Sequence, residues 1–215
     1  MANHFYILNL FIIYSENKED MEKSVFKTER LILRPLKLSD FDDVWEYDSD
    51  YEVVKYMYEL SVRPGEVMEK QESKDYLSSV EEEWKKENPD FCEFAIELAD
   101  SASGENGRNK VIGNICLFID KDRVNGEFGW MLNRKYQNKG YATEAAECLK
   151  NIAFNELGFK SLRAHCDERN KASRRVMEKL GMSLVWEHGY RKYPRTGEES
   201  TELLMEVKSL QAQTD

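Results

Sequence analysis

The sequence predicts a mixed α/β fold in a single domain, and three observations carry this prediction. The chain has 215 residues, of which 41% are hydrophobic and 33% charged, which is enough for one core and excludes wholesale disorder. From residue 28 onwards, short stretches alternate between apolar and polar residues, as in half-buried strands. Between them lie segments with apolar residues at helical spacing. We therefore expect seven strands in one mixed, mostly antiparallel sheet that is flanked by helices.

The first half is expected to supply four of these strands and the first helices. Residues 28–36 form the first strand, and Ser39 is expected to N-cap a helix with Asp42 and Asp43 in its first turn. A longer helix is expected at residues 66–86, between a Pro-Gly pair and an Asn-Pro pair. The next strands are expected at residues 91–98, 110–119 and 127–133, and the first two of them are joined by the polar loop 101–109.

The second half alternates more regularly. A helix follows Gly140, carries Ala145, Leu149, Ile152 and Ala153 on one face, and is expected to end at Gly158. The fifth strand is expected at residues 161–166. Asn170 is expected to cap another helix, in which Ala172, Val176 and Leu180 form an apolar stripe up to Gly181. Two strands at residues 183–190 and 199–207 close the chain around a turn at residues 194–197.

The domain is expected to span residues 25–210, with an N-terminal extension at 1–24, where Met21 is an alternative start, and a tail at 211–215. The longest apolar run, residues 5–14, is about half of the roughly twenty residues that a membrane span needs. The four cysteines contain no CxxC pair, which argues against a zinc site and a disulfide framework. We therefore expect a cytoplasmic protein without a metal and without a membrane partner.

Charge is distributed unevenly along a chain whose net charge is −10. Residues 39–100 contain 20 acidic and 6 basic side chains, whereas residues 134–195 contain 14 basic and 7 acidic ones. The first region would attract cations and the second a compact anion, although solvated helix faces would produce the same asymmetry. The basic region has no recognised motif for reading nucleic acid, so we expect no nucleic-acid partner.

The segment 132–145 (LNRKYQNKGYATEA) is the most informative one for chemistry. A predicted strand runs into a polar turn, and Gly140 opens an amphipathic helix. Free backbone N–H groups and the helix dipole form a phosphate site at such a helix start, and a glycine lets the backbone approach the anion. Thr143 adds a hydroxyl, and Lys139 and Arg134 add positive charge. A plain strand-to-helix connection is the alternative, and neither a Walker loop nor a GxGxxG motif is present.

The stretch QNKGYA (residues 137–142) resembles the Q/R-x-x-G-x-G/A pyrophosphate loop of the GNAT N-acetyltransferases. Three further blocks follow the family's order: TERLILRP at 28–35, GEFGWML at 126–132, and NKAS…EKLGM at 170–182. The set is similar to the branch of ribosomal-protein N-terminal alanine acetyltransferases, and the resemblance covers about residues 28–207.

The resemblance implies a GNAT fold whose sheet splays between the fourth and fifth strands, with acetyl-CoA (coenzyme A) in the opening as co-substrate. It implies that the pantetheine pairs with the backbone of Met131, Leu132 and Asn133, and that Asn170 makes a second contact to it while capping its helix. The pyrophosphate would lie on the loop formed by Gln137, Asn138, Lys139, Gly140, Tyr141, Ala142 and Thr143. The implied activity is acetyl transfer to a primary amine by direct attack in a ternary complex. The alternative is a non-catalytic acyl-CoA-binding regulatory module.

Two side chains are candidates for catalysis. The resemblance makes Glu127 the general base, although a surface glutamate on a strand would look the same in sequence. Many GNAT enzymes use a tyrosine to protonate the departing thiolate, but Met177 stands at that position here. Ser173 therefore becomes the candidate donor, as in the similar branch. A backbone N–H near Met131 or Leu132 would polarise the thioester carbonyl.

Other prominent residues are not assigned a catalytic role. His165 and His188 form no metal-ligand or triad pattern and are interpreted as structural, and Cys148 and Cys166 lack an activating base. The segment 56–58 (YMY) lines the acceptor pocket or belongs to the core, and Trp84 and Trp130 are interpreted as packing residues. We expect a positively charged acceptor, a protein N-terminus or a small cationic amine. A homodimer is compatible with the sequence.

Overall fold

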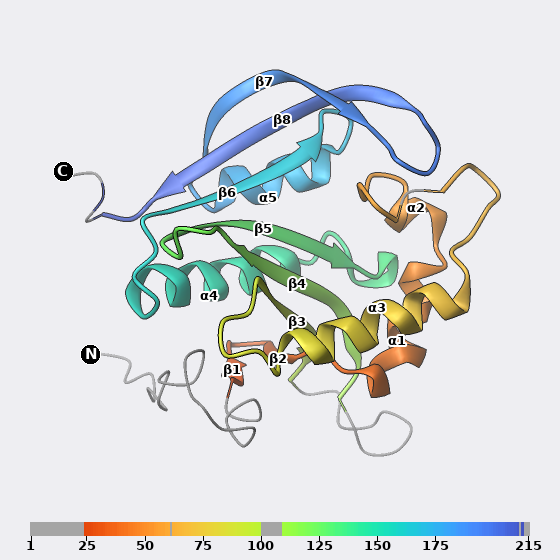
Figure 1. Cartoon of the computed structure of the whole chain (residues 1–215), viewed down its shortest axis with the longest axis horizontal. Helices are drawn as coiled ribbons and strands as arrows, with labels where there is room; N and C mark the ends of the chain where they lie inside the picture. Colours follow the sequence, from red (N-terminus) through yellow and green to blue (C-terminus); the bar gives the residue numbers. More distant parts are fainter. Residues whose placement is uncertain (1–23, 61, 100–108, 211, 213–215) are drawn as a thin grey trace.

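The computed structural model describes residues 24–60, 62–99, 109–210 and 212, and in them eight strands form one sheet in the order β1-β2-β3-β4-β5-β6-β8-β7 (Figure 1). The mixed α/β architecture is confirmed, with one strand more than predicted. The additional strand, β1 (Phe26–Lys27), is only two residues long and pairs with β2 (Leu31–Pro35). Most of the predicted N-terminal extension, of the 101–109 loop and of the C-terminal tail lies outside the described residues.

The N-terminal half builds an antiparallel sheet from β2, β3 (Phe91–Leu98), β4 (Val111–Ile119) and β5 (Asn125–Leu132). The helices α1 (Phe41–Asp48), α2 (Tyr51–Val54) and α3 (Lys70–Glu83) precede β3 in the chain, and α1 and α3 cover β3 and β4. The longer helix α4 (Tyr141–Asn155) packs against β2, β4 and β5 behind the sheet in the view of Figure 1. Apolar side chains such as Leu33 and Phe94 are fully buried between these layers.

The start of the first helix differs from the prediction. Residues Leu38–Asp40 form a 3-10 turn (η2), and α1 begins at Phe41, so Ser39 is not its N-cap. The reason is an ion pair: Arg34 on β2 donates to both carboxylate oxygens of Asp40 at 2.7 Å, which fixes the turn against the sheet. Helix α3 is shorter than the predicted 66–86 because Glu69 and Glu72 form a capping box at its start. The four-residue helix α2 was not predicted.

The C-terminal half consists of β6 (Ser161–Asp167), α5 (Lys171–Lys179), β7 (Ser183–Lys192) and β8 (Glu199–Lys208). Strand β6 is parallel to β5, but the two pair only from Asn125–Ser161 to Glu127–Arg163. Beyond these residues they separate, as Figure 1 shows, which confirms the predicted splay between the fourth and fifth predicted strands, here β5 and β6. The opening between them is the feature that positions the candidate site.

Helix α5 confirms one sequence prediction and corrects another. Asn170 caps it, because its side-chain oxygen accepts the N–H of Ser173 at 3.1 Å. In this helix and its C-cap, Met177 and Leu180 are buried, whereas Ala172 is exposed and Val176 is half-buried and packs against the core. The predicted apolar stripe is therefore wrong in part, since Ala172 is exposed and Met177, which was not a member, is buried.

All four cysteines are free, and burial raises the pKa of each thiol. In the described part of the chain, no helix combines the length and the apolarity that crossing a membrane requires.

Candidate functional site

A cleft of about 1490 Å³ opens where β5 and β6 separate. It exceeds the roughly 300–1,000 Å³ of common small-molecule pockets, so it has room for more than one ligand. The residues predicted for the site that line it are Glu127, Met131, Leu132, Gln137, Asn138, Gly140, Tyr141, Ala142, Thr143, Asn170 and Ser173. The two others, Asn133 and Lys139, are adjacent in sequence but do not belong to the lining. Residues from three separate stretches of sequence, on β5, in the loop 137–143 and at the start of α5, thus meet in one cavity.

The open edge of β5 supplies backbone groups to the cleft. Toward β6, the carbonyl of Val124 accepts the N–H of Lys160 at 2.7 Å, and toward β4, the N–H of Asn133 is donated to Ile112 at 2.8 Å. Because successive residues of a strand direct their backbone groups to opposite sides, Trp130 and Leu132 direct theirs to the open edge. Met131 directs its backbone groups toward β4.

This alternation determines which of the predicted strand residues have backbone groups available to a ligand. The carbonyl of Asn133 accepts the N–H of Tyr136 at 2.8 Å, so both of its backbone groups are engaged within the protein. The carbonyl of Leu132 accepts a hydrogen bond from the Gln137 side chain at 2.9 Å, which joins the strand to the loop that follows. Trp130, interpreted from sequence as a packing residue, is half-buried and lines the cleft. The parity of the β4–β5 register would have identified it, but one sequence does not contain that register.

The loop 137–143 has the backbone geometry of an anion site. Gly140 is the N-cap of α4 with φ of +84°, and Asn138 is also left-handed with φ of +61°. The carbonyl of Gly140 accepts the N–H of Glu144 at 3.0 Å, whereas the N–H groups of residues 141–143 precede the first intrahelical bond. Such alternation of backbone conformations turns successive N–H groups toward one concave point. A side chain at Gly140 would bring its Cβ to 3.3 Å from the guanidinium of Arg30.

Arg30 belongs to a hydrogen-bond network that fixes the conformation of this loop. Glu144, in the first turn of α4, accepts hydrogen bonds from Thr28 Oγ1 at 2.5 Å and from Arg30 N and Nε at 2.9 and 2.6 Å. Arg30 also donates to the carbonyl of Lys139 at 3.0 Å and lies over the ring of Tyr141 at 4.6 Å. Burial would raise the pKa of Glu144, but these hydrogen bonds bring it below its ordinary value. The sequence block 28–35 and the loop are therefore parts of one site.

Glu127 stands at the point where β5 and β6 part. Arg163 Nε lies 3.5 Å and His165 Nε2 lies 3.6 Å from its carboxylate, and His165 Nδ1 lies 3.4 Å from Glu202. Burial raises the pKa of Glu127, although the charges of His165 and Arg163 oppose the shift. A carboxylate with a raised pKa is a better proton acceptor near neutral pH than an ordinary one. His165 thus lies in the cleft between two carboxylates, a place that its interpretation as structural does not account for.

Ser173 lies in the first turn of α5, at the N-terminus of that helix. It is half-buried and lines the cleft, whereas Met177, one turn further, is fully buried. Cys166 lines the same wall, and burial raises the pKa of its thiol to about 11, which leaves little thiolate at neutral pH. Of these groups, Ser173 is the one that can donate a proton into the cleft, and a covalent route through Cys166 is not favoured.

Charged side chains of both signs line the cleft. Lys171, Arg175 and Lys179 follow one another at four-residue spacing along α5 and line the cleft as exposed basic side chains. Helix α2 and the segment that follows it contribute Glu52 and Glu59 together with Lys55, which pairs with Glu52 at 2.7 Å. The aromatic segment 56–58 also lines the cleft, and only Met57 packs against the core as well. The sequence alternatives for this segment are thus resolved mainly in favour of the pocket.

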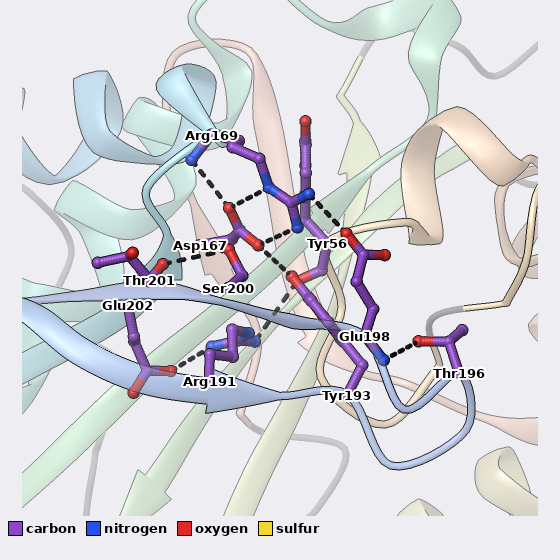
Figure 2. Close-up of polar contacts among 10 residues, drawn as sticks. All are labelled: Tyr56, Asp167, Arg169, Arg191, Tyr193, Thr196, Glu198, Ser200, Thr201 and Glu202. Carbon is purple, nitrogen blue, oxygen red and sulfur yellow. Dashed lines mark hydrogen bonds and ion pairs between the residues drawn. The ribbon is translucent and has the colours of Figure 1, made fainter.

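A buried carboxylate at the end of β6 ties the outer strands to the cleft (Figure 2). Asp167 is fully buried and accepts hydrogen bonds from Arg169 Nε and Nη2 at 2.8 and 2.6 Å and from Tyr193 Oη at 2.8 Å. Burial opposes ionisation, but these donors hold the pKa of Asp167 well below its usual range. Arg169 also pairs with Glu198 at 2.6 Å and lies over the ring of Tyr56. The network therefore fixes the β7–β8 hairpin and one wall of the cleft together.

Among the residues that the structure describes, no three His, Cys, Asp or Glu side chains converge as a metal site would require.

Comparisons with known proteins agree with this geometry. The family model described as "Acetyltransferase (GNAT) domain" matches residues 30–183. An N-acetyltransferase of Bacillus subtilis (strain 168), YnaD, is 32% identical over 155 residues, which are 72% of this chain and 80% of YnaD. The N-acetyltransferase p20 of Bacillus licheniformis is 27% identical over 153 residues, 71% of this chain and 79% of p20.

Solved structures give the same result. A GNAT-family acetyltransferase from Bacillus anthracis has a TM-score of 0.69 at 28% identity, covering 86% of this chain and 98% of its own. The ribosomal L7/L12 α-N-protein acetyltransferase RimL, solved with coenzyme A, has a TM-score of 0.70 at 12% identity with the same coverage. At that identity the likeness extends to the fold alone.

Proposed function

The chain belongs to the GNAT acetyltransferase family, and from this premise we propose that it transfers the acetyl group of acetyl-CoA directly to a primary amine. The observation that carries the proposal is the meeting, in one cleft, of the loop 137–143, the open edge of β5, Glu127 and Ser173. The acceptor is proposed to be cationic, a protein N-terminus or a small amine, because the carboxylates of Glu93, Glu127 and Glu202 line the cleft.

The cofactor is proposed to lie along the loop and the strand edge. Its pyrophosphate would accept hydrogen bonds from the N–H groups of residues 138–143, where the left-handed Asn138 and Gly140 support a concave set of donors. Its pantetheine amides would pair with Trp130 and Leu132, whose backbone groups are directed to the edge that β6 leaves open. Asn170 would make the second contact, and the basic stripe of α5 favours the nucleotide phosphates.

The proposed chemistry begins with the proton of the amine. An α-amino group with a pKa of about 8 needs only a modest base, whereas a lysine side chain with a pKa of about 10.4 is neutral about once in a thousand molecules at neutral pH. Glu127, whose pKa is raised, accepts that proton. His165 lies between Glu127 and Glu202 and would hold the Glu127 side chain in position. The neutral nitrogen then attacks the thioester carbon and forms the C–N bond.

The second half of the reaction breaks the C–S bond. A backbone N–H of Trp130 or Leu132 would stabilise the negative oxygen of the tetrahedral intermediate, because it is a fixed donor at the strand edge. As the intermediate collapses, the attached nitrogen loses its second proton through water, Ser173 gives its hydroxyl proton to the departing thiolate, and the proton lost by the nitrogen restores the serine hydroxyl. The products are the amide and free coenzyme A, and no covalent acyl-enzyme is needed.

Thiol release tests the proposal. Acetyl-CoA is incubated with the protein and a panel of amines that contains short peptides with free N-termini and aliphatic amines, and free thiol is measured. The matched control is the same peptides with acetylated N-termini, which offer no α-amine. We expect release only with free amines. Calorimetric binding of coenzyme A without thiol release from any amine would contradict the proposal and indicate a non-catalytic acyl-CoA-binding module.

A further inference from the structure

A second buried carboxylate lies in the floor of the cleft. Glu93, in the middle of β3, is only 2% exposed and lines the cavity. It accepts hydrogen bonds from Tyr76 Oη of α3 at 2.8 Å and from Asn114 Nδ2 of β4 at 2.5 Å, and the Cys116 thiol is a third donor. All of these donors are neutral groups.

The surroundings of Glu93 contain no compensating positive charge. Within the described residues, no Lys or Arg acts on this carboxylate, and the charged group that does face it, Asp48 of α1, is another carboxylate. Burial raises the pKa of Glu93, and the hydrogen bonds from Asn114, Cys116 and Tyr76 offset this only in part. A buried carboxylate without a cation is costly, and titratable groups with shifted pKa values in a cleft are candidates for a functional site.

The same floor contains an acceptor atom without a donor. Asn114 is 7% exposed and lines the cleft, and its Oδ1 is buried without a hydrogen-bond partner in the described part of the chain. Buried polar atoms are nearly always satisfied, so an orphaned one beside a ligand cavity indicates a missing donor. Glu93 and Asn114 Oδ1 together present acceptors only. A group with several N–H donors and a positive charge, an ammonium, satisfies both.

The floor is accessible from the reaction centre. Cys116 pairs with Glu93 on one side and with Gly129 of β5 on the other, so all three lie in one row across the same face of the sheet. Gly129 has no side chain to close this row, and a Cβ there would meet only Phe118 at 3.5 Å. Two strand spacings of about 4.8 Å separate the β5 edge from β3. A cation on Glu93 is therefore a short aliphatic chain away from the reacting thioester.

We propose that Glu93 and Asn114 Oδ1 form a receptor for a second, non-reacting ammonium group, so that the acceptor is an aliphatic diamine or polyamine. This inference rests on the proposed function, because it concerns the acceptor of the same reaction. One nitrogen is acetylated at the β5 edge beside Glu127, and the other remains protonated on Glu93. The rings of Tyr76, Phe91 and Phe118 line the path and favour a cation over water.

The test compares amines that differ only in the second nitrogen. Putrescine and cadaverine are measured against n-butylamine and n-pentylamine in the thiol-release assay. We expect kcat/KM for each diamine to exceed that for its monoamine by about 30-fold or more, as for a buried charge pair. In Glu93→Gln the diamine advantage should disappear, whereas the KM for acetyl-CoA and the rate with monoamines should stay the same. Asn114→Ala should lower the advantage by about tenfold.

A matched control exists on the neighbouring helix. Glu83 is also a buried glutamate, but it accepts the N–H of Asp90 at 2.6 Å, pairs with Lys86 and lies outside the cleft lining. Glu83→Gln should leave the diamine advantage unchanged. Equal rates for diamines and monoamines in the unaltered protein, or an advantage that survives in Glu93→Gln, would overturn the receptor.

Direct binding separates this inference from the proposed function. Putrescine is titrated calorimetrically into the protein with coenzyme A present, a measurement that requires no turnover. Loss of putrescine binding in Glu93→Gln, with coenzyme A binding retained, supports the receptor even if no amine is acetylated. Acetylation of monoamines without any binding of putrescine would support the proposed function and exclude the receptor.

Discussion

Two of the buried carboxylates, Asp167 at the end of β6 and Glu93 in the lining of the cleft, have opposite surroundings. Asp167 is fully buried but saturated, with hydrogen bonds from the side chain and backbone of Arg169 and from Tyr193, and its pKa is lowered. Glu93 is nearly as buried, but its donors are neutral, its pKa is raised, and its neighbour Asn114 keeps an orphaned oxygen. Similar burial thus produces opposite electrostatics.

The difference distinguishes a carboxylate that stabilises the fold from one that is available to a ligand. A fully satisfied polar network rigidifies a structure, and the Asp167 network joins β6 to the β7–β8 hairpin. From that hairpin, Arg195 donates to the carbonyl of Glu59 at 2.7 Å and pairs with Glu72, which anchors the hairpin to α3 and to the segment that follows α2. An incompletely satisfied network weakens the protein until a ligand completes it. We therefore expect changes around Asp167 to affect stability and changes in the cleft to affect activity.

The largest expected effect is on turnover, at the two side chains proposed to act on the reacting atoms. Removing a general base or acid typically lowers a rate by a factor of about 10² to 10⁴. We therefore expect Glu127→Gln and Ser173→Ala each to lower kcat by a factor in that range. The affinity for coenzyme A and the melting temperature should change little, because neither substitution alters the loop. Steady-state kinetics and calorimetry measure both. Full turnover in Ser173→Ala would assign protonation of the thiolate to water instead.

The next effect contrasts the two carboxylates directly. Asp167→Asn removes a charge that Arg169 and Tyr193 depend on, and should lower the free energy of unfolding by about 3 kcal/mol. Glu93→Gln should change it by less than about 1 kcal/mol at pH 7, because the amide keeps the shape and removes an uncompensated buried charge. Urea denaturation of both variants at one pH gives the comparison. A larger loss in Glu93→Gln than in Asp167→Asn would contradict it.

Asp48, which lies near Glu93, should make the stability of the protein depend on pH. Burial and the nearby Glu93 raise its pKa to about 6, against a hydrogen bond from Ser73 that lowers it. Between pH 4 and 6 the folded state therefore binds more protons than the unfolded state, so this group's stabilisation is present at low pH and lost as pH rises through about 6. Asp48→Asn should reduce the difference in unfolding free energy between pH 4.5 and 7.5 by about 2 kcal/mol. An unchanged difference would refute the buried-carboxylate assignment.

The smallest expected effect is on cofactor affinity at the loop. Gly140→Asp imposes a side chain and a negative charge at a left-handed residue that faces the proposed pyrophosphate, and should weaken coenzyme A binding at least about tenfold. Gly158→Asp at the other end of α4 is the matched control, since Gly158 is also left-handed with φ of +71° and free space around it. If both variants bind coenzyme A like the unaltered protein, the pyrophosphate lies elsewhere.

The local elements of this fold could be predicted because their signals are local. Gly140 opens α4 and Asn170 caps α5 through contacts within three or four residues, and alternation of apolar residues identified the longer strands. The first helix was misplaced for the opposite reason. Asp40 rather than Ser39 fixes its start, through an ion pair with Arg34 that depends on how the turn packs against β2.

The parts of the site that were not predicted depend on register between strands. The backbone groups of Trp130 are directed to the open edge because the strand register places the hydrogen bonds of Asn133 on the β4 side. His165 reaches Glu127 because β6 runs parallel to β5 in a register that places Arg163 opposite Glu127. Glu93 and Asn114 meet across two strands that are about twenty residues apart in sequence. A single sequence supplies the residue types for these contacts but no information on which residues face one another.

Electron density for bound coenzyme A is the most direct test of the central claim that one cleft holds both the cofactor and the catalytic side chains. We predict pyrophosphate oxygens within hydrogen-bond distance of the backbone nitrogens of residues 138–143. The pantetheine should follow Trp130 and Leu132, and the sulfur should lie between Glu127 and Ser173. A pyrophosphate bound away from this loop, or a sulfur remote from both side chains, would contradict the account.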